Sequence, residues 1–144
     1  MPLAYAVARR WYAWRRPDRR TAAVIVWHGD RVVTVAHSYK SGRSLPGGGL
    51  RCHEAPAPGA ARELHEETGI AVDPADLRLL DITVLNGRYG KRTTWFYELH
   101  LARPPHLRVN GWEVVNAAMS LPETVPALAD FLRSSGAGAL PHAG

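Results

Sequence analysis

Three glutamates at helical spacing are the residues of this chain best placed to do chemistry. Glu63, Glu66 and Glu67 lie at positions i, i+3 and i+4, so in a helix they crowd onto one side. Glu63 and Glu67 form a like-charge pair, and Glu66 and Glu67 fall in the last turn, where the helix dipole disfavours anions by about 0.3–1 kcal/mol each. The opposite face, which we expect to pack on a sheet, holds Ala57, Ala61, Leu64 and Thr68.

A bound cation would remove the cost of this arrangement. Carboxylate oxygens favour a hard divalent ion, Mg²⁺ or Mn²⁺, over zinc. Within the helix only Arg62, four residues before Glu66, offers local relief. The spacing alone fits an ordinary acidic, solvent-facing helix surface equally well, and both interpretations stay open at this point.

The elements that must position these carboxylates follow from periodicity and from turn residues. A helix is expected from near Pro58 to Gly69, because glycine is the usual residue just after a helix end. A loop rich in glycine and proline, residues 41–49, precedes it. The other elements that we expect are strands at 21–27 and 31–37 joined by a turn at 28–30, strands at 79–85 and 92–101 joined by a hairpin loop at 86–91, and a last helix at 122–133.

Nine positions around the helix follow the pattern G-x5-E-x7-R-E-U-x-E-E-x-G-U, in which U is a bulky aliphatic residue. They are Gly48, Glu54, Arg62, Glu63, Leu64, Glu66, Glu67, Gly69 and Ile70. Average residue frequencies make a chance match on the order of 10⁻⁹ per window. The pattern resembles the signature box of the Nudix hydrolases at every specified position, and Leu45-Pro46-Gly47-Gly48 resembles the usual approach to that box. The motif covers residues 48–70, and the element order extends the resemblance over about 21–133.

The resemblance implies an α/β fold, the Nudix α/β/α sandwich with a mixed sheet. It also implies hydrolysis of a diphosphate linkage in a nucleoside diphosphate joined to another group X, with water as nucleophile. Members use one to three divalent ions, usually Mg²⁺, with Mn²⁺ as a substitute. This chemistry agrees with the carboxylates, because metal ions offset the charge that develops on a diphosphate and activate a bound water.

The resemblance also assigns metal ligands. Glu63, Glu66 and Glu67 resemble the carboxylate ligands of the family, and a backbone carbonyl near Gly47 or Gly48 resembles a further ligand. Glu63 or Glu66 could double as the base that takes a proton from water.

The remaining roles concern positioning. Arg62 would pair with a carboxylate of the box and hold it in place, while Glu54 and Gly69 resemble structural members. Outside the box, Glu113 is the residue at which we would look for an extra base or ligand, and a plain surface-loop glutamate fits there at least as well.

The substrate is not fixed by the sequence. In the family, a proline about sixteen positions past the box resembles a preference for ADP-ribose, and a tyrosine there a preference for dinucleoside polyphosphates. That position is Asn86, and Tyr89 nearby leaves the dinucleoside option open. The alternatives are a nucleoside triphosphate hydrolase, an enzyme acting on RNA 5′ ends, or a non-catalytic nucleotide-binding module. Aromatic residues that could stack on a base are Trp27, Tyr39, Tyr89, Trp95 and Tyr97.

The N-terminal segment carries the net charge. Residues 1–20 hold six arginines against one aspartate, which accounts for the whole formal excess of +5. Residues 3–15 predict an amphipathic helix with a stripe of Leu3, Val7, Trp11 and Trp14, packed on the body of the protein or on a partner subunit in a homodimer. The basic arm is the one support for nucleic-acid binding, and a solvated helix explains it as well.

Length and composition suit one small domain. The chain has 144 residues, 46% of them hydrophobic, and no apolar run near the roughly 20 residues of a membrane span. The start lacks a secretory signal, and the single Cys52 excludes an internal disulfide, so we expect a cytoplasmic protein. The expected division is a basic arm at 1–20, a Nudix domain at 21–135 and a flexible tail at 136–144.

Overall fold

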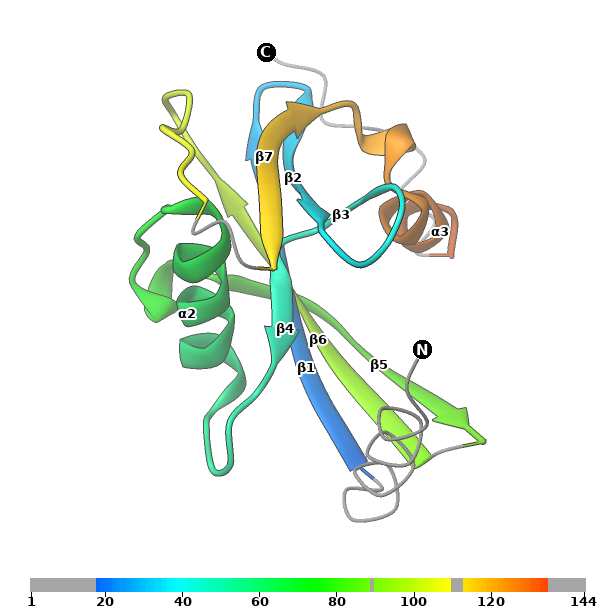
Figure 1. Ribbon diagram of the computed structural model, residues 1–144. Coiled ribbons are helices and arrows are strands. Elements are labelled where there is room, and N and C mark those ends of the chain that lie inside the picture. Colours follow the sequence, from blue (N-terminus) through cyan, green and yellow to red (C-terminus); the bar gives the residue numbers. More distant parts are fainter. Residues whose placement is uncertain (1–17, 89, 110–112, 135–144) are drawn as a thin grey trace.

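The computed structural model describes residues 18–88, 90–109 and 113–134 (Figure 1). The predicted helix over 3–15 and the predicted tail over 136–144 lie outside these residues. The elements in chain order are strands β1 (Asp18–His28), β2 (Arg31–His37), β3 (Arg43–Ser44) and β4 (Gly47–Gly49), helix α2 (Pro56–Thr68), 3₁₀ turn η1 (Pro74–Asp76), strands β5 (Arg78–Gly87), β6 (Gly90–His100) and β7 (Val114–Ser120), 3₁₀ turn η2 (Pro122–Thr124) and helix α3 (Pro126–Ser134).

Strand β1 is the centre of a mixed sheet. Along one side it pairs in parallel with β6, from Asp18 opposite Lys91 to Trp27 opposite His100, and β5 completes this edge antiparallel to β6. Along the other side, the first half of β1 pairs with β4 and its end pairs with β2. Strand β2 then pairs with both β3 and β7.

The side chains of β1 alternate between two cores, because successive residues of a strand point to opposite faces. Ala22, Val24 and Val26 pack with residues of α2 such as Leu64. Ile25 and Trp27 pack on the other face, with Val125 and with Leu128, Phe131 and Leu132 of α3. The two helices therefore cover opposite faces of the sheet (Figure 1), which confirms the predicted α/β/α sandwich.

The central helix and both hairpins are confirmed with small shifts, since β1 begins at Asp18 and α2 at Pro56. The segment 41–49, expected as a loop, contains β3 and β4, and the strand β7 was not predicted. The last helix is divided, because Pro126 disfavours the helical conformation of the residue before it and fits the first turn of a new helix.

Substitutions in the two cores test whether both helix layers stabilise the domain. The side chains of Leu64 on α2 and Leu128 on α3 are completely buried, so Leu64→Ala and Leu128→Ala should each lower the unfolding free energy by about 2–5 kcal/mol. The control Leu85→Ala, at a 56% exposed position, should change it by less than about 0.5 kcal/mol. Urea unfolding measures all three, and a Leu128→Ala variant as stable as the control would show that α3 is not part of the cooperative fold.

Candidate active site

Helix α2 carries the box carboxylates on its C-terminal half, beside β4 (Figure 1). The helix ends as predicted, with Gly69 in the left-handed conformation at φ 78° and its N–H donating to the carbonyl of His65. Leu64 and Thr68 pack the helix on the sheet, and the Thr68 hydroxyl donates to the carbonyl of Leu64. This anchoring fixes the rotation of the helix and hence the direction of each glutamate.

Glu67 is buried, with 7% of its surface exposed, which corrects the expectation that all three glutamates lie on the side away from the sheet. Its Oε2 accepts a hydrogen bond of 2.9 Å from the N–H of Gly47 on β4. Burial, together with the charges of Glu63 and Glu113, raises the pKa of Glu67 to about 7, although the hydrogen bond from Gly47 and the charge of Lys40 act in the other direction. The free energy of burying this charge is therefore not fully offset within the chain.

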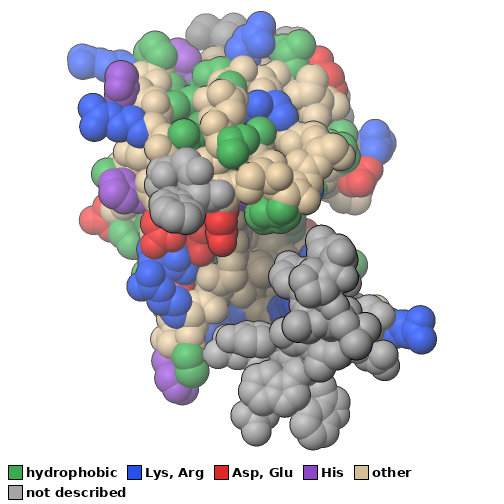
Figure 2. All heavy atoms as spheres, viewed as in Figure 1, with side chains coloured by type: hydrophobic (Ala, Val, Ile, Leu, Met, Phe, Trp, Pro, Cys, Tyr) green, Lys and Arg blue, Asp and Glu red, His purple; other side chains and the backbone are tan. Residues whose placement is uncertain are grey.

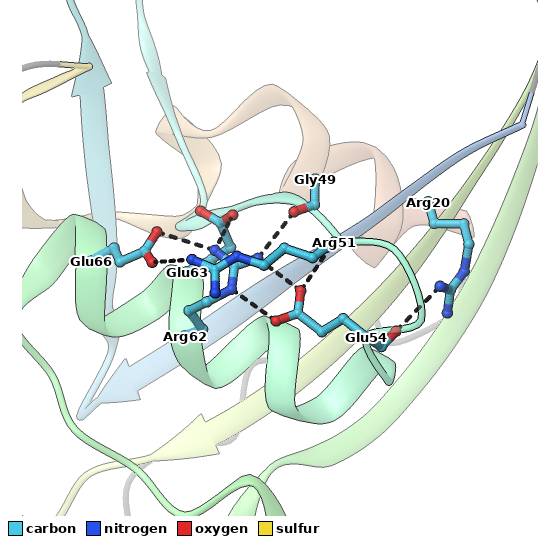
Figure 3. Close-up of polar contacts among 7 residues, drawn as sticks. All are labelled: Arg20, Gly49, Arg51, Glu54, Arg62, Glu63 and Glu66. Carbon is cyan, nitrogen blue, oxygen red and sulfur yellow. Dashed lines mark hydrogen bonds and ion pairs between the residues drawn. The ribbon is translucent and has the colours of Figure 1, made fainter. Parts of the chain in front are cut away.

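Arg62 connects three carboxylates, as Figure 3 shows. Its Nε and Nη2 donate to the two carboxylate oxygens of Glu54, both at 2.8 Å, in a bidentate pair. Its Nη1 donates to Glu63 at 2.9 Å and to Glu66 at 3.1 Å, and Nη2 also donates to the carbonyl of Gly49. A single guanidinium thus fixes the loop before the helix relative to the carboxylates on it.

Glu54 is the carboxylate that this pairing compensates most. The hydrogen bonds from Arg62, and next the N–H of Arg51, lower the pKa of Glu54 to about 2. Glu54 in turn raises the pKa of the Arg62 guanidinium. Glu54 is therefore ionised at neutral pH and acts as an anchor for Arg62.

Glu63 lies against the glycine strand. A Cβ at Gly48 would come within 2.7 Å of the carboxyl carbon of Glu63, so a glycine is needed for the carboxylate to occupy this place. Burial raises the pKa of Glu63, while its ion pair with Arg62 lowers it. Glu63 is thus only partly compensated.

Glu113 lies directly before β7 and is exposed. Its charge contributes to the raised pKa values of Glu63 and Glu67, so the fold brings it within electrostatic range of the box although it is far away in the sequence. Strand β7 pairs with β2 so that Val114 lies opposite His37, and this pairing brings the neighbouring Glu113 toward the box.

The sequence marked Tyr39, just after β2, as a candidate for base stacking but did not connect it with the carboxylates. Tyr39 is 68% exposed and its ring lies 5.2 Å from that of His37. Burial, and then the charges of Glu113 and Glu67, raise the pKa of Tyr39, so its hydroxyl lies within electrostatic range of these carboxylates. The charge of Lys40 acts on Glu67 from the same segment. No sequence pattern connects these residues with the carboxylates, because the pairing of β2 with β7 brings them together.

The aromatic candidates for base stacking differ in how far their side chains are buried. Trp27 and Tyr97 are core residues, so neither presents a face to a ligand. The guanidinium of Arg20 lies 5.3 Å above the ring of Trp95. Tyr89 lies outside the described residues. Tyr39 alone of the four described candidates is largely exposed.

The donor set suits a hard divalent cation. Its side-chain ligands are all oxygen, two of the three carboxylates have a raised pKa, and the missing Cβ of Gly48 lets the Glu63 carboxylate lie directly against β4. Among residues 18–88, 90–109 and 113–134, no three Asp, Glu, His or Cys side chains are arranged to share one ion. Two of the box carboxylates, Glu63 and Glu66, pair with Arg62 instead. Figure 2 shows acidic side chains in one patch on this face, with basic side chains directly beside it.

Comparison with known proteins assigns the family. A family model described as the NUDIX domain matches residues 17–135. The chain therefore belongs to the Nudix family of pyrophosphohydrolases, enzymes that cleave phosphorus-containing acid anhydrides. A search of curated proteins found no match. Within the described residues, no helix combines the length and the apolar character needed to cross a membrane.

Several solved structures share the fold at low sequence identity. A MutT NUDIX hydrolase from Burkholderia pseudomallei is 19% identical with a TM-score of 0.63, over 76% of this chain and 87% of that chain. An Ap4A hydrolase from C. elegans is 16% identical with a TM-score of 0.60, over 82% and 90%. A bifunctional NMN adenylyltransferase/ADP ribose pyrophosphatase from Francisella tularensis, complexed with AMP and a Mn ion, is 23% identical with a TM-score of 0.61, over 88% of this chain and 42% of that chain.

The raised pKa of Glu67 predicts a pH-dependent effect on stability. Because the pKa rises from 4.5 to about 7 on folding, ionisation of Glu67 opposes folding increasingly as the pH rises through this range. In metal-free buffer, Glu67→Gln should therefore match the parent near pH 4 and exceed it at pH 8 by an unfolding free energy of the order of 3 kcal/mol, at about 1.4 kcal/mol per pKa unit. Urea unfolding with a chelator at both pH values measures the difference.

Glu66→Gln is the matched control, because Glu66 is 42% exposed and pairs with Arg62. Its loss removes an ion pair and no buried charge, so the stability of this variant relative to the parent should not rise with pH. A flat difference for Glu67→Gln as well would show that Glu67 is not a destabilising buried carboxylate.

Proposed function

We propose that this protein hydrolyses the diphosphate linkage of a nucleoside diphosphate joined to another group, with water as nucleophile and Mg²⁺ as cofactor, for which Mn²⁺ can substitute. The observation that carries the proposal is the carboxylate cluster on α2, in which Glu67 is buried beside β4 without full compensation. A cation at this place would offset that charge. Membership of the Nudix family supports the same reaction.

Glu63, Glu66 and Glu67 would hold the cation, together with the backbone carbonyl of Gly47 or Gly48. Bound there, the cation supplies a water of lowered pKa and offsets the charge that builds up on the phosphate oxygens. Glu63 and Glu66 would have to turn toward the cation, because both now pair with Arg62.

Proton transfer from the attacking water falls to a carboxylate that is not fully used as a ligand. We assign it to Glu63 or Glu66, with Glu113 as the alternative because its charge already acts on Glu63 and Glu67. Arg62 is a positioning residue, since it holds Glu63 and Glu66, while Glu54 fixes Arg62 itself.

The substrate class is narrowed by the site and by structural relatives. Tyr39 is the aromatic residue that combines exposure with nearness to the carboxylates, so it is the first candidate for stacking on a nucleobase. Two structural relatives are an Ap4A hydrolase and an ADP ribose pyrophosphatase, so we would test dinucleoside polyphosphates and ADP-ribose first. We place the enzyme in the cytoplasm, since its one cysteine, Cys52, is free and exposed.

A substrate screen tests the proposed activity. With Mg²⁺, the protein should release phosphate-containing products from one class among ADP-ribose, dinucleoside polyphosphates, nucleoside diphosphate sugars, nucleoside triphosphates and 5′-triphosphorylated RNA. The double variant Glu63→Gln, Glu67→Gln should lose this turnover by at least about 100-fold while remaining folded by circular dichroism. Silence across all classes with both Mg²⁺ and Mn²⁺ would favour a nucleotide-binding module instead.

The role of Arg62 predicts a specific loss. Lysine cannot donate to Glu54, Glu63 and Glu66 together, so Arg62→Lys should lower activity or metal affinity by about 10- to 100-fold with the fold intact. Arg51→Lys is the matched control, since the exposed guanidinium of Arg51 lies 3.5 Å from Glu66, while the N–H that Arg51 donates to Glu54 belongs to the backbone and is kept in the variant. Steady-state kinetics over a Mg²⁺ titration separate the two effects, and equal behaviour of both variants would refute a positioning role for Arg62.

A further inference from the structure

Three apolar side chains of the edge strand β5 lie together on one exposed face, which we call the β5 face. Leu79, Ile82 and Val84 are 47%, 46% and 50% exposed. Ile82 lies opposite Trp95, and Trp95 lies opposite Ala22, whose side chain packs beneath α2. The β5 face is therefore on the α2 side of the sheet, and the irregularity between Leu79 and Asp81 brings Leu79 onto it as well.

Helix α2 leaves this part of the sheet open. It packs mainly over β1 and β4 and also contacts β6, whereas the far ends of β5 and β6 extend beyond the helices (Figure 1). An edge strand that exposes several apolar side chains can pair or pack with a further segment, and such an apolar patch commonly marks a contact surface. The remaining question is which partner covers it.

The chain that precedes β1 has a matching apolar stripe. Leu3, Val7, Trp11 and Trp14 recur at intervals of three and four residues, so in a helix they share one face. At 3.6 residues per turn, Arg9 and Arg16 fall on the opposite face. Pro17 separates this segment from β1.

The connection places the stripe within reach of the β5 face. Asp18 pairs with Lys91, and Lys91 pairs with Asn86, so the chain enters the sheet two strands away from Asn86 and close to Val84. With strands about 4.8 Å apart and residues about 3.3 Å apart, Asp18 lies roughly 12 Å from Val84. The four residues from Trp14 to Asp18 span up to about 14 Å. A helix over residues 3–15 would be about 20 Å long, which is enough to cover the distance from Val84 to Leu79.

We propose that residues 3–15 fold back as an amphipathic helix onto the β5 face of their own chain, with Trp11 and Trp14 against Ile82 and Val84. This contact covers the exposed edge and turns Arg9 and Arg16 outward. The partner is thus the chain's own N-terminal segment, and the proposal is independent of the proposed function.

Trypsin digestion of the full chain under native conditions tests the contact, since cleavage after Arg9 and Arg10 requires that the segment leave the sheet. In the double variant Ile82→Asp, Val84→Asp, this cleavage, followed by mass spectrometry, should be at least 10-fold faster than in the parent. Leu85→Asp is the matched control: Leu85 is on the same strand and equally exposed, but its register partners Arg92 and Arg19 place it on the α3 side. Its cleavage should match the parent.

A variant in the segment itself controls for the possibility that the substitutions on β5 disturb the sheet. Trp11→Glu, Trp14→Glu leaves every described residue unchanged and should give the same acceleration, with an intact far-ultraviolet circular dichroism spectrum. Equal cleavage rates in the parent and in both double variants would overturn the proposal. Protection that disappears on dilution, together with dissociation of a dimer in light scattering, would overturn it in favour of a second copy of the chain.

Discussion

The guanidinium of Arg62 is the interaction on which the site depends. Without it, the carboxylates of Glu54, Glu63 and Glu66 would face one another without a compensating charge, and their repulsion would push the loop at Glu54 away from the C-terminal half of α2. The bidentate pair with Glu54 fixes the plane of the guanidinium, which leaves Nη1 directed at the other two carboxylates. The loop is held in turn by β1, because Arg20 donates to the carbonyl of Glu54 and accepts from the N–H of Leu50. The central strand β1 therefore fixes the loop at Glu54, the loop fixes Arg62, and Arg62 fixes two of the carboxylates on the helix.

The glycines of β4 are the second constraint, and two of them act for different reasons. A Cβ at Gly47 would lie 2.2 Å from the carbonyl oxygen of Ala22, so this glycine permits the close approach of β4 to β1. A Cβ at Gly48 would instead displace the carboxylate of Glu63. The short strand β4 therefore contacts β1 on one side and the carboxylates on the other. The N–H of its Gly47 donates a hydrogen bond to the buried Glu67.

The sequence predicted the elements whose signals are local. The span of α2 follows from its periodicity and from Gly69, and the pairing of Arg62 with Glu66 follows from helical spacing. Strands β4 and β7 were missed, because a run of glycines or a short mixed segment becomes a strand only when β1 or β2 offers a partner. The burial of Glu67 was missed for the same reason: helical spacing grouped it with Glu63, but the hydrogen bond that makes its burial tolerable comes from another element. Local spacing thus gave the residues of the site, whereas their environments came from non-local pairing.

The charges of the carboxylate cluster determine whether a diphosphate could bind alone or only together with a cation. Arg62 compensates Glu54 so fully that the pKa falls to about 2, yet the pKa of Glu67 rises to about 7 in the same cluster. One guanidinium cannot neutralise four carboxylates, and Glu113 adds further negative charge at the rim. A diphosphate that approached this patch alone would be repelled, because like charges at short range cost several kcal/mol where water is partly excluded. A cation held by the carboxylates would reverse the sign of that interaction, so the residual negative charge that opposes the metal-free fold is the same property that would let the proposed site bind an anionic substrate together with a divalent ion.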